Sequence, residues 1–308
     1  MKIPIMENKL SDKNRNNRNR KGRGVSHSKI ILMGEHSVVY GYPAIAIPLK
    51  NIQMECIVER SRVPFFHNEK DTLSTAVHTA LKYLNRKNEN IKYKVISDIP
   101  PKRGMGSSAA VSIAAIRGVL DYFNRKVDNV TLEKLVNEAE IIAHNTPSGL
   151  DAKTCLSDSA IKFIKNKGFK NIDINLGAYL LIADTGIHGH TRDAIMNIKN
   201  MGNKALPMLE KLGKLTEETE KFIEKKDVVN IGKNMISAHE ELKRLGVSIE
   251  KSDVLVETAI EEGAYGAKMS GGGLGGCIIA LMENREKAEM TGKKLMEKGA
   301  VNIWIEAL

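Results

Sequence analysis

Residues 101–110, PKRGMGSSAA, combine residue types that suit the binding of a phosphate group. Gly104 and Gly106 let the backbone turn tightly and come close to a ligand. Two serines follow them, where a helix over residues 109–119 is expected to begin. The free N–H groups and the positive dipole end of a helix favour an anion. We therefore predict that this segment holds the phosphate tail of a nucleotide.

Residues 270–276 form a second glycine-rich segment, between two expected strands. They include five glycines, although each glycine costs backbone entropy and a plain flexible hairpin needs fewer. Ser270 and the successive N–H groups predict a nest for a second anion or for a transferred phosphoryl group. A dinucleotide-binding fingerprint needs a strand directly before its glycines and a helix directly after them. Residues 270–276 are followed by a strand, and residues 100–103 separate Gly104 from the strand before it, so neither segment fits. A nicotinamide enzyme is therefore disfavoured, and the sequence contains no Walker loop.

Residues 145–151, NTPSGLD, are a third candidate. A Pro-Ser-Gly turn followed by Asp151 is common in loops. Glu140, however, lies eleven residues earlier, at the edge of the apolar stripe of a helix for which Thr131 is the expected N-cap. Taken alone, Glu140 is more simply a boundary residue of an amphipathic helix. Two carboxylates brought together by a helix and a turn would suit Mg²⁺ and a proton acceptor.

The composition is typical of a globular protein, and the length is sufficient for two domains. The chain has 308 residues and 34.0 kDa, with 42% hydrophobic and 27% charged residues. No apolar run approaches the roughly 20 residues that span a bilayer, and no secretory signal is evident. Cys56, Cys155 and Cys277 are far apart, as is typical of buried free thiols in a reducing cytosol. We expect a cytoplasmic protein without a membrane partner.

The net charge of +10 is concentrated at the N-terminus. Residues 1–24, the basic arm, hold eight Lys or Arg against Glu7 and Asp12, so +6 lies in the arm and +4 in the rest. The arm has too few apolar residues to fold alone, and a solvated, flexible extension is the simpler interpretation. A nucleic-acid-binding protein is the alternative, disfavoured because the arm has no aromatic residues on which bases could stack.

Hydrophobic periodicity predicts both strands and helices in each half of the chain. In the first half we expect strands at 25–33, 53–59 and 91–95, and helices around 73–84, 109–119 and 131–143. In the second half we expect a strand at 178–183, helices at about 193–225, 227–245 and 252–262 with Gly246 and Gly263 as C-terminal stops, strands at 264–269 and 277–282, a helix from Asn284, and a strand at 301–305. The second half matches a split β-α-β-β-α-β sandwich.

Residues 29–44, KIILMGEHSVVYGYPA, resemble the first motif of the GHMP small-molecule kinases, in the form found in the branch that phosphorylates mevalonate. Residues 101–110 are similar to the second motif of this family. Residues 268–277, KMSGGGLGGC, are similar to the third. The three motifs occur in the family's order, and only the basic arm lies outside the resemblance.

The resemblance implies a two-domain α+β fold with the active site in the interdomain cleft. Residues 25–177 would form an N-terminal α/β domain that binds ATP, and residues 178–308 a C-terminal ferredoxin-like domain. It further implies ATP as co-substrate, Mg²⁺ as cofactor, and an early step of isoprenoid biosynthesis. A homodimer is compatible with the sequence.

The resemblance also implies roles for individual residues. Asp151 would accept the proton of the substrate's terminal hydroxyl, and Lys29 would lie against that hydroxyl and the transferred phosphoryl group. Ser108 and Glu140 would hold Mg²⁺. The ATP-binding residues would be Ser97, Lys102, Arg103, Gly104, Met105, Gly106, Ser107, Ser108 and Ala109, and the substrate-binding residues Lys29, Glu35, His36, Thr191, Ser270 and Gly271.

The first motif favours mevalonate as the acceptor. Galactokinases follow Gly-Glu-His with an Asp-Tyr pair that reads sugar hydroxyls, whereas residues 37–40 here are SVVY. Homoserine kinases lack the K-x-x-L-x-G-E-H run, and a phosphomevalonate enzyme would need more cationic residues. These three kinase types are nevertheless the alternatives within the family. In the third motif, Ser270 stands where threonine is common and keeps the hydroxyl, whereas Leu274 stands where glycine is usual and would narrow the conformational freedom of the loop.

Overall fold

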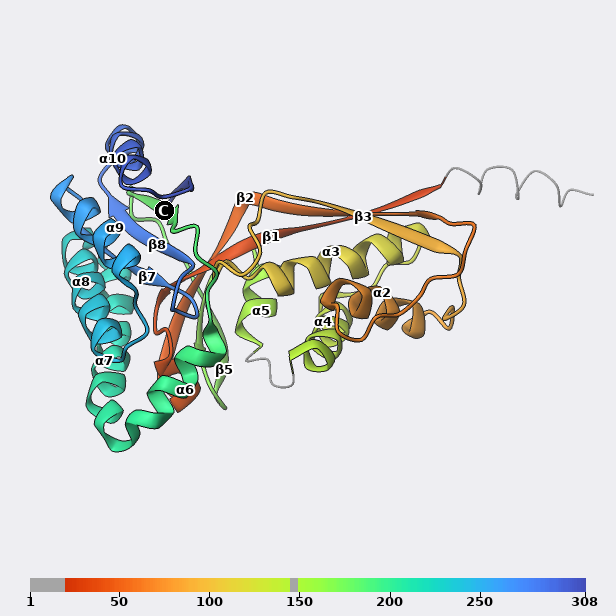
Figure 1. Ribbon diagram of the computed structural model, residues 1–308, viewed down its shortest axis with the longest axis horizontal. Coiled ribbons are helices and arrows are strands. Elements are labelled where there is room, and N and C mark those ends of the chain that lie inside the picture. Colours follow the sequence, from red (N-terminus) through yellow and green to blue (C-terminus); the bar gives the residue numbers. More distant parts are fainter. Residues whose placement is uncertain (1–19, 145–148) are drawn as a thin grey trace, which may run out of the picture. The chain divides into compact units, whose positions relative to one another are not determined.

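The computed structural model describes residues 20–144 and 149–308. These residues form helices and antiparallel sheets, as the α+β prediction requires (Figure 1). The strands are β1 (Lys21–Met33), β2 (Pro43–Arg60), β3 (Ile91–Ser97), β4 (Ala160–Ile164), β5 (Gly168–Ile172), β6 (Tyr179–Asp184), β7 (Gly266–Ser270), β8 (Cys277–Met282) and β9 (Asn302–Ala307). The α-helices are α2 (Thr72–Tyr83), α3 (Ser107–Tyr122), α4 (Asn129–His144), α5 (Leu150–Leu156), α6 (Thr191–Met201), α7 (Leu206–Glu224), α8 (Val228–Arg244), α9 (Glu250–Glu261) and α10 (Arg285–Glu297), with 3₁₀ turns η1 (Ser37–Tyr40) and η2 (Gly202–Ala205).

The chain divides into two compact units that alternate along the sequence. Of the described residues, unit 1 comprises 20–26, Met54–Ser97 and 111–144, and unit 2 comprises His27–Gln53, Asp98–Ala110 and 149–308. Strands β1 and β2 and helix α3 each contribute residues to both units. The boundary expected at residues 177/178 stays a prediction.

Unit 1 is built from helices α2, α3 and α4 and the second half of β2. That half pairs antiparallel with β3, with Met54 opposite Ser97 and Arg60 opposite Ile91. Lys82 of α2 and Glu138 of α4 form an ion pair at 2.8 Å. The prediction of Thr131 as the N-cap of this helix is wrong, because α4 already begins at Asn129. Asp128 caps it instead: its Oδ1 accepts a hydrogen bond from Thr131 N at 2.7 Å.

Strand β1 begins at Lys21, four residues before the expected start and therefore within the basic arm. In this extension β1 passes so close to α3 that a Cβ on Gly24 would lie 2.1 Å from the Ala114 carbonyl oxygen. Only glycine, which has no side chain, allows this approach. Arg23 N also donates to Asp121 Oδ2 at 2.8 Å. Residues 1–19 of the arm, and residues 145–148 of the NTPSGLD segment, lie outside the described residues.

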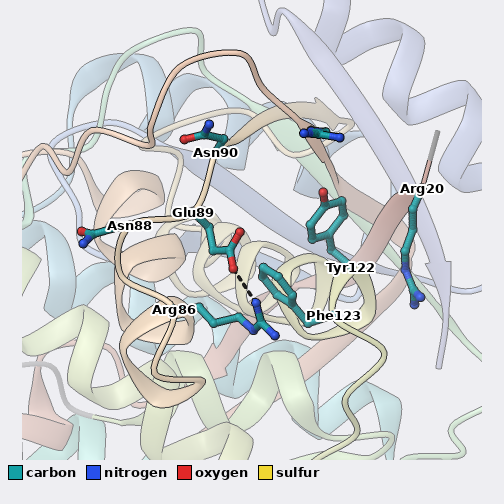
Figure 2. Close-up of a pocket in the computed structure, with 8 residues that line it drawn as sticks. Arg20, Arg86, Asn88, Glu89, Asn90, Tyr122 and Phe123 are labelled. Atoms are coloured by element: carbon teal, nitrogen blue, oxygen red, sulfur yellow. Dashed lines mark hydrogen bonds and ion pairs between the residues drawn. The ribbon is translucent and has the colours of Figure 1, made fainter. Parts of the chain in front are cut away.

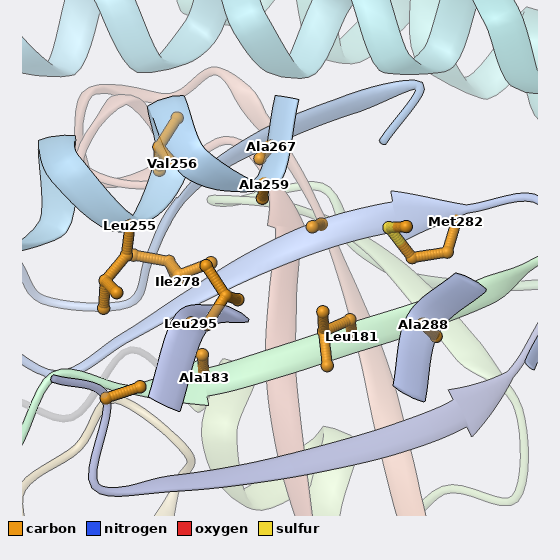
Figure 3. Close-up of a cluster of buried hydrophobic side chains, with 12 residues drawn as sticks. Leu181, Ala183, Leu255, Val256, Ala259, Ala267, Ile278, Met282, Ala288 and Leu295 are labelled. Atoms are coloured by element: carbon orange, nitrogen blue, oxygen red, sulfur yellow. The ribbon is translucent and has the colours of Figure 1, made fainter. Parts of the chain in front are cut away.

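Unit 2 contains a four-stranded antiparallel sheet with the strand order β7-β8-β6-β9. Because β6 is the first of these strands in the chain, the order is that of a split β-α-β-β-α-β sandwich, as predicted. Helices α9 and α10 pack on the sheet through a cluster of buried aliphatic residues that includes Leu181, Leu255, Ile278 and Leu295 (Figure 3). A second core joins β1, β2, β4 and α5.

Several elements differ from the sequence-based expectation. The helix expected over 193–225 is divided into α6, η2 and α7, because Gly202 adopts φ 56° and ends α6. The β4–β5 hairpin, helix α5 and the first half of β2 were not expected. The C-terminal stops Gly246 and Gly263 are confirmed, with φ of 69° and 91°.

The three cysteines are buried free thiols, as expected. Burial raises the pKa of Cys56 to about 12, with a further contribution from Glu55, and raises the pKa of Cys277 well above its usual range. In the part of the chain that the structure describes, no helix is long and apolar enough to cross a membrane.

We predict that Gly266→Ala destabilises unit 2 more than Gly246→Ala does. A Cβ on Gly266 would lie 1.9 Å from the Gly232 carbonyl oxygen of α8, so α8 and β7 must move apart to accommodate it. We expect this to lower the free energy of unfolding by about 3 kcal/mol. Gly246 has open space around it, so alanine there meets no steric clash. Only the left-handed φ of 69° is unfavourable for alanine, and we expect it to lower the free energy of unfolding by about 1–2 kcal/mol. Urea unfolding measures both, and equal losses of stability would contradict this packing.

Candidate active site

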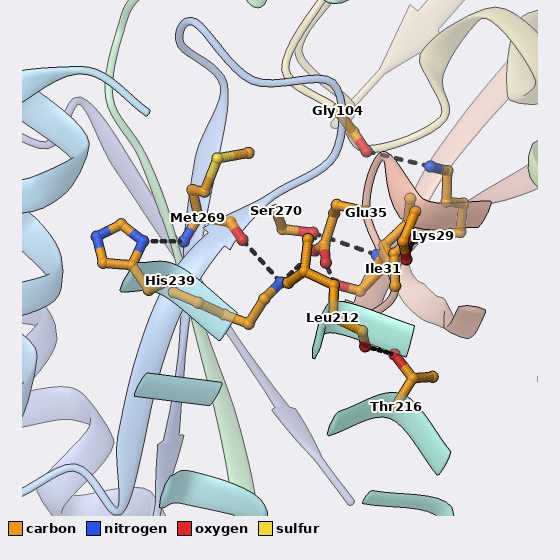
Figure 4. Close-up of polar contacts among 12 residues, drawn as sticks. Lys29, Ile31, Glu35, Gly104, Leu212, Thr216, His239, Met269 and Ser270 are labelled. Atoms are coloured by element: carbon orange, nitrogen blue, oxygen red, sulfur yellow. Dashed lines mark hydrogen bonds and ion pairs between the residues drawn. The ribbon is translucent and has the colours of Figure 1, made fainter. Parts of the chain in front are cut away.

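The predicted proton acceptor and the predicted catalytic lysine lie together in unit 2. Lys29 Nζ contacts Asp151 Oδ1 at 2.8 Å. The Lys29 side chain, on β1, is only 2% exposed, whereas that of Asp151, in the first turn of α5, is 48% exposed. Lys29 Nζ also donates a hydrogen bond to the Gly104 carbonyl oxygen at 3.3 Å (Figure 4). Asp151 thus combines exposure to solvent with a buried lysine as its ion-pair partner.

The predicted phosphate-binding loop has a sharply turned backbone before α3. Lys102, Gly104 and Gly106 all adopt left-handed conformations, with φ of 58°, 78° and 71°. Helix α3 then begins at Ser107, whose Oγ accepts a hydrogen bond from Lys102 N at 3.4 Å. The side chains of Met105 and Ala109 are buried, so these two residues can offer a ligand only backbone groups.

The glycine-rich segments approach each other and the first motif closely. A Cβ on Gly271 would lie 2.7 Å from Gly104 Cα, and a Cβ on Gly106 would lie 2.8 Å from Lys29 Cγ. A Cβ on Gly272 would lie 1.7 Å from Thr191 Oγ1. The structure therefore brings residues of all three motifs, and Thr191, into one region of unit 2.

Arg103 contacts the protein itself through two of its three guanidinium nitrogens, whereas Nη1 is buried without a hydrogen-bond partner among the described residues. Its Nε contacts Asp184 Oδ1 at 2.8 Å, and its Nη2 donates to the Gly186 carbonyl oxygen at 2.9 Å. The ion pair is largely buried, with 11% and 4% of the two side chains exposed. Arg103 thus anchors the phosphate-binding loop to the end of β6. The sequence did not predict Asp184 as the partner of Arg103. The two residues are 81 positions apart, and an acidic residue at the end of a strand does not indicate which residue it will contact.

Two residues of the third motif have structural roles. Ser270 Oγ donates to the Ile31 carbonyl oxygen at 2.8 Å and accepts from Ile31 N at 3.2 Å, so its hydroxyl is already paired with β1 (Figure 4). Leu274 adopts φ 53°, a conformation that favours glycine, and its N–H donates to the Val247 carbonyl oxygen at 2.7 Å. Leucine is therefore held in the backbone geometry that the family's glycine would adopt freely.

Glu35 and His36 are both buried beside this loop. Glu35 forms an ion pair with Lys268 of β7, and neither side chain is exposed. A Cβ on Gly273 would lie 3.4 Å from His36 Nε2. Burial, reinforced by the charge of Lys268, lowers the pKa of His36 to about 4, so the imidazole is neutral at pH 7. Lys268 received no role from the sequence, although a lysine inside an otherwise apolar strand was a usable signal.

Two predicted residues lie in unit 1, not unit 2. Ser97 ends β3 and is exposed. Glu140 of α4 is 6% exposed, and its Oε1 accepts a hydrogen bond from Ser112 Oγ at 2.9 Å. Ser112 follows Ser108 by four residues in α3, so the two serines lie on one face of that helix.

The donor set is compatible with Mg²⁺. The described residues contain no group of three or more His, Cys, Asp or Glu that could hold a metal ion. Mg²⁺ in kinase sites, however, needs only one or two protein ligands, because water and phosphate complete its shell. The buried carboxylate of Glu140 fits that requirement.

A pocket of about 520 Å³ in unit 1 contains none of the predicted site residues (Figure 2). It is lined by Arg20, Arg60, Arg86, Asn88, Glu89, Asn90, Tyr122 and Phe123. Arg86 Nη1 pairs with Glu89 at 2.5 Å and its guanidinium lies over the Phe123 ring, while Arg20 donates to the Asp121 carbonyl oxygen. Two of its three arginines are therefore engaged by the protein.

Comparison with known proteins agrees with the motifs. The family model "GHMP kinases N terminal domain" matches residues 73–158, and "GHMP kinases C terminal" matches residues 219–299. The mevalonate kinase of Pyrococcus furiosus is 30% identical over 306 residues, covering 87% of this chain and 91% of the relative.

Solved structures show the same fold. The L. major mevalonate kinase in complex with R-mevalonate has a TM-score of 0.84 and 24% identity, covering 94% of this chain and 97% of that one. The Methanococcus jannaschii mevalonate kinase has a TM-score of 0.81 and 25% identity, covering 94% and 99%. The two-domain prediction is thereby confirmed. Taken with the three motifs in their order, these matches establish that the chain belongs to the mevalonate kinases of the GHMP kinase family.

Proposed function

We propose that this protein transfers the terminal phosphoryl group of ATP to the 5-hydroxyl of mevalonate, giving 5-phosphomevalonate and ADP in isoprenoid biosynthesis. The observation that carries the proposal is the 2.8 Å contact between Lys29 Nζ and Asp151 Oδ1 beside the Gly104 carbonyl. A carboxylate next to a fixed cation can accept the proton of an alcohol while the cation stabilises the alkoxide that develops.

Asp151 and Lys29 have complementary roles in this proposal. The half-exposed carboxylate of Asp151 meets the 5-hydroxyl and takes its proton. The buried ammonium of Lys29 faces the same oxygen and the incoming phosphoryl group. Because phosphoryl transfer needs little covalent help from a protein, alignment and charge neutralisation by such groups supply most of the catalysis.

The loop before α3 would hold the ATP phosphates. Its left-handed turns at Gly104 and Gly106 leave backbone N–H groups near the start of α3, where the helix dipole favours anions. The Arg103–Asp184 ion pair anchors this loop to the end of β6. Ser97 is assigned to the nucleotide, and Thr191, Glu35, His36 and the backbone at residues 270–271 to mevalonate.

Ser108 and Glu140 are the residues that would hold Mg²⁺. When bound, the ion neutralises charge on the phosphates of ATP. The Ser112–Glu140 hydrogen bond supports this assignment, because it fixes the carboxylate against the helix that carries Ser108.

The acceptor is assigned from two observations. The relative from Pyrococcus furiosus is a mevalonate kinase, and the L. major structure contains R-mevalonate. Residues 37–40 here, SVVY, lack the Asp-Tyr pair with which galactokinases read a sugar.

The purified protein is expected to release ADP with mevalonate far faster than with galactose, homoserine or phosphomevalonate. A coupled assay of ADP release with each acceptor, at the same ATP and Mg²⁺ concentrations, measures this. A higher kcat/KM for any of the other three acceptors would assign the protein to another GHMP kinase activity.

Asp151→Asn is expected to lower kcat by about 10²–10⁴-fold, because an amide cannot accept the hydroxyl proton. ATP binding, measured by calorimetry, should be unchanged. Asp158→Asn, at an exposed position shortly after α5, is the matched control and should retain full activity. Full activity of Asp151→Asn would refute its assignment as the base.

Glu140→Gln is expected to raise the Mg²⁺ concentration for half-maximal activity by about 10–100-fold. The amide oxygen can still accept the Ser112 hydrogen bond, so the fold should persist. Glu138→Gln, on the same helix but 43% exposed, is the control and should show the wild-type Mg²⁺ requirement. Identical Mg²⁺ curves for all three proteins would remove Glu140 from the metal site.

A further inference from the structure

Lys268 and Glu35 are buried together among residues assigned to the substrate. Lys268 lies inside β7 with 0% exposure, and Glu35 follows β1 with 1% exposure. Besides the ion pair, Lys268 Nζ donates a hydrogen bond to the Met269 carbonyl oxygen at 2.8 Å. Taking two charges out of water costs about as much as their attraction returns, so such a pair contributes little net stability. A role in the site accounts for it better.

The ion pair uses only part of the hydrogen-bonding capacity of this cluster. Glu35 Oε2 is buried and has no hydrogen-bond partner among the described residues, and the same is true of His36 Nε2. Buried polar atoms without partners are rare, because each loses its contact with water and gains nothing in return. Two of them on adjacent residues indicate that a ligand supplies the missing partners.

The missing partner of Glu35 must be a hydrogen-bond donor, because an ionised carboxylate only accepts. For His36 the charge state decides. With its pKa near 4, its ring is neutral, and its hydrogen bond to the Gly272 backbone raises the pKa, as a bond donated by the ring would. The unpartnered Nε2 is then the nitrogen without a proton and also accepts. Both open atoms therefore require donors.

Mevalonate offers few groups that donate. Its carboxylate only accepts, its methyl group does neither, and the proposed mechanism assigns its 5-hydroxyl to Asp151. The tertiary hydroxyl remains. A hydroxyl has one proton to donate, and a carboxylate is the stronger acceptor. Building on the proposed function, we infer that Lys268 is a positioning residue that fixes the Glu35 carboxylate so that Glu35 Oε2 accepts the hydrogen bond of the tertiary hydroxyl of the substrate.

The charge of Lys268 serves this arrangement in two ways. It holds Glu35 through Oε1, which leaves Oε2 as the open acceptor. It also disfavours a second positive charge on His36. The backbone next to Glu35 is tightly packed, because a Cβ on Gly34 would lie 2.4 Å from the Pro43 carbonyl oxygen. This packing limits how far the backbone that carries Glu35 can move.

The test compares Lys268→Met with the double variant Lys268→Met/Glu35→Gln. The single variant leaves a buried carboxylate without its cation and is expected to lose stability. The double variant removes both charges and should regain stability in thermal unfolding. Its KM for mevalonate should nevertheless stay raised at least about tenfold, with an unchanged KM for ATP, because the ordered carboxylate acceptor is gone.

Lys162→Met is the matched control. Lys162 forms an ion pair with Glu220 in the same unit, with 17% and 14% of the side chains exposed, and no role in the site is assigned to it. It should lose stability without a change in the KM for mevalonate. A stable double variant with the wild-type KM for mevalonate would show that Lys268 is structural only and would overturn the inference.

A measurement on the unmodified protein keeps the inference testable if the variants fail to fold. The dissociation constants of mevalonate and of its analogue without the tertiary hydroxyl are compared by calorimetry. The analogue should bind at least about 10²-fold more weakly, because it leaves the buried Oε2 of Glu35 unpaired. Equal binding would overturn the inference while leaving the proposed function intact. A protein that binds and phosphorylates neither compound would instead contradict the proposed function itself.

Discussion

The buried ammonium of Lys29 is the charge around which the site of unit 2 is arranged. With only 2% of the side chain exposed, Lys29 cannot be solvated and must be compensated by the protein. Asp151 Oδ1 at 2.8 Å and the Gly104 carbonyl at 3.3 Å supply that compensation. Strand β1, the loop before α3 and helix α5 must therefore meet at one point. That requirement brings three distant segments of the chain together at the proposed catalytic residues.

Close backbone approach is the second requirement, and glycine satisfies it. A side chain on Gly106 would collide with Lys29, one on Gly271 with Gly104, and one on Gly272 with Thr191. Glycine in these loops thus has a steric reason besides the proposed binding of anions. Leu274 shows the contrast: its φ of 53° is maintained by the hydrogen bond to Val247, at some cost in backbone strain.

Local patterns in the sequence predicted most elements but few side-chain partners. The alternation in β3, the spacing in α2 and the glycine stops after α8 and α9 are local signals and were confirmed. The division between α6 and α7 and the early start of β1 were missed, because tertiary contacts and a single glycine decide them. The meeting of Lys29 with Asp151 followed from the family resemblance alone. The partners of Arg103 and Lys268 depend on long-range packing that no local pattern encodes.

The most direct measurement of the central claim is a crystal structure with mevalonate and a non-hydrolysable ATP analogue. It should place the 5-hydroxyl oxygen about 2.6–3.2 Å from an Asp151 carboxylate oxygen, with Lys29 Nζ beside the same oxygen. A complex in which that hydroxyl faces another acid, while the Lys29–Asp151 pair stays away from both ligands, would contradict the account.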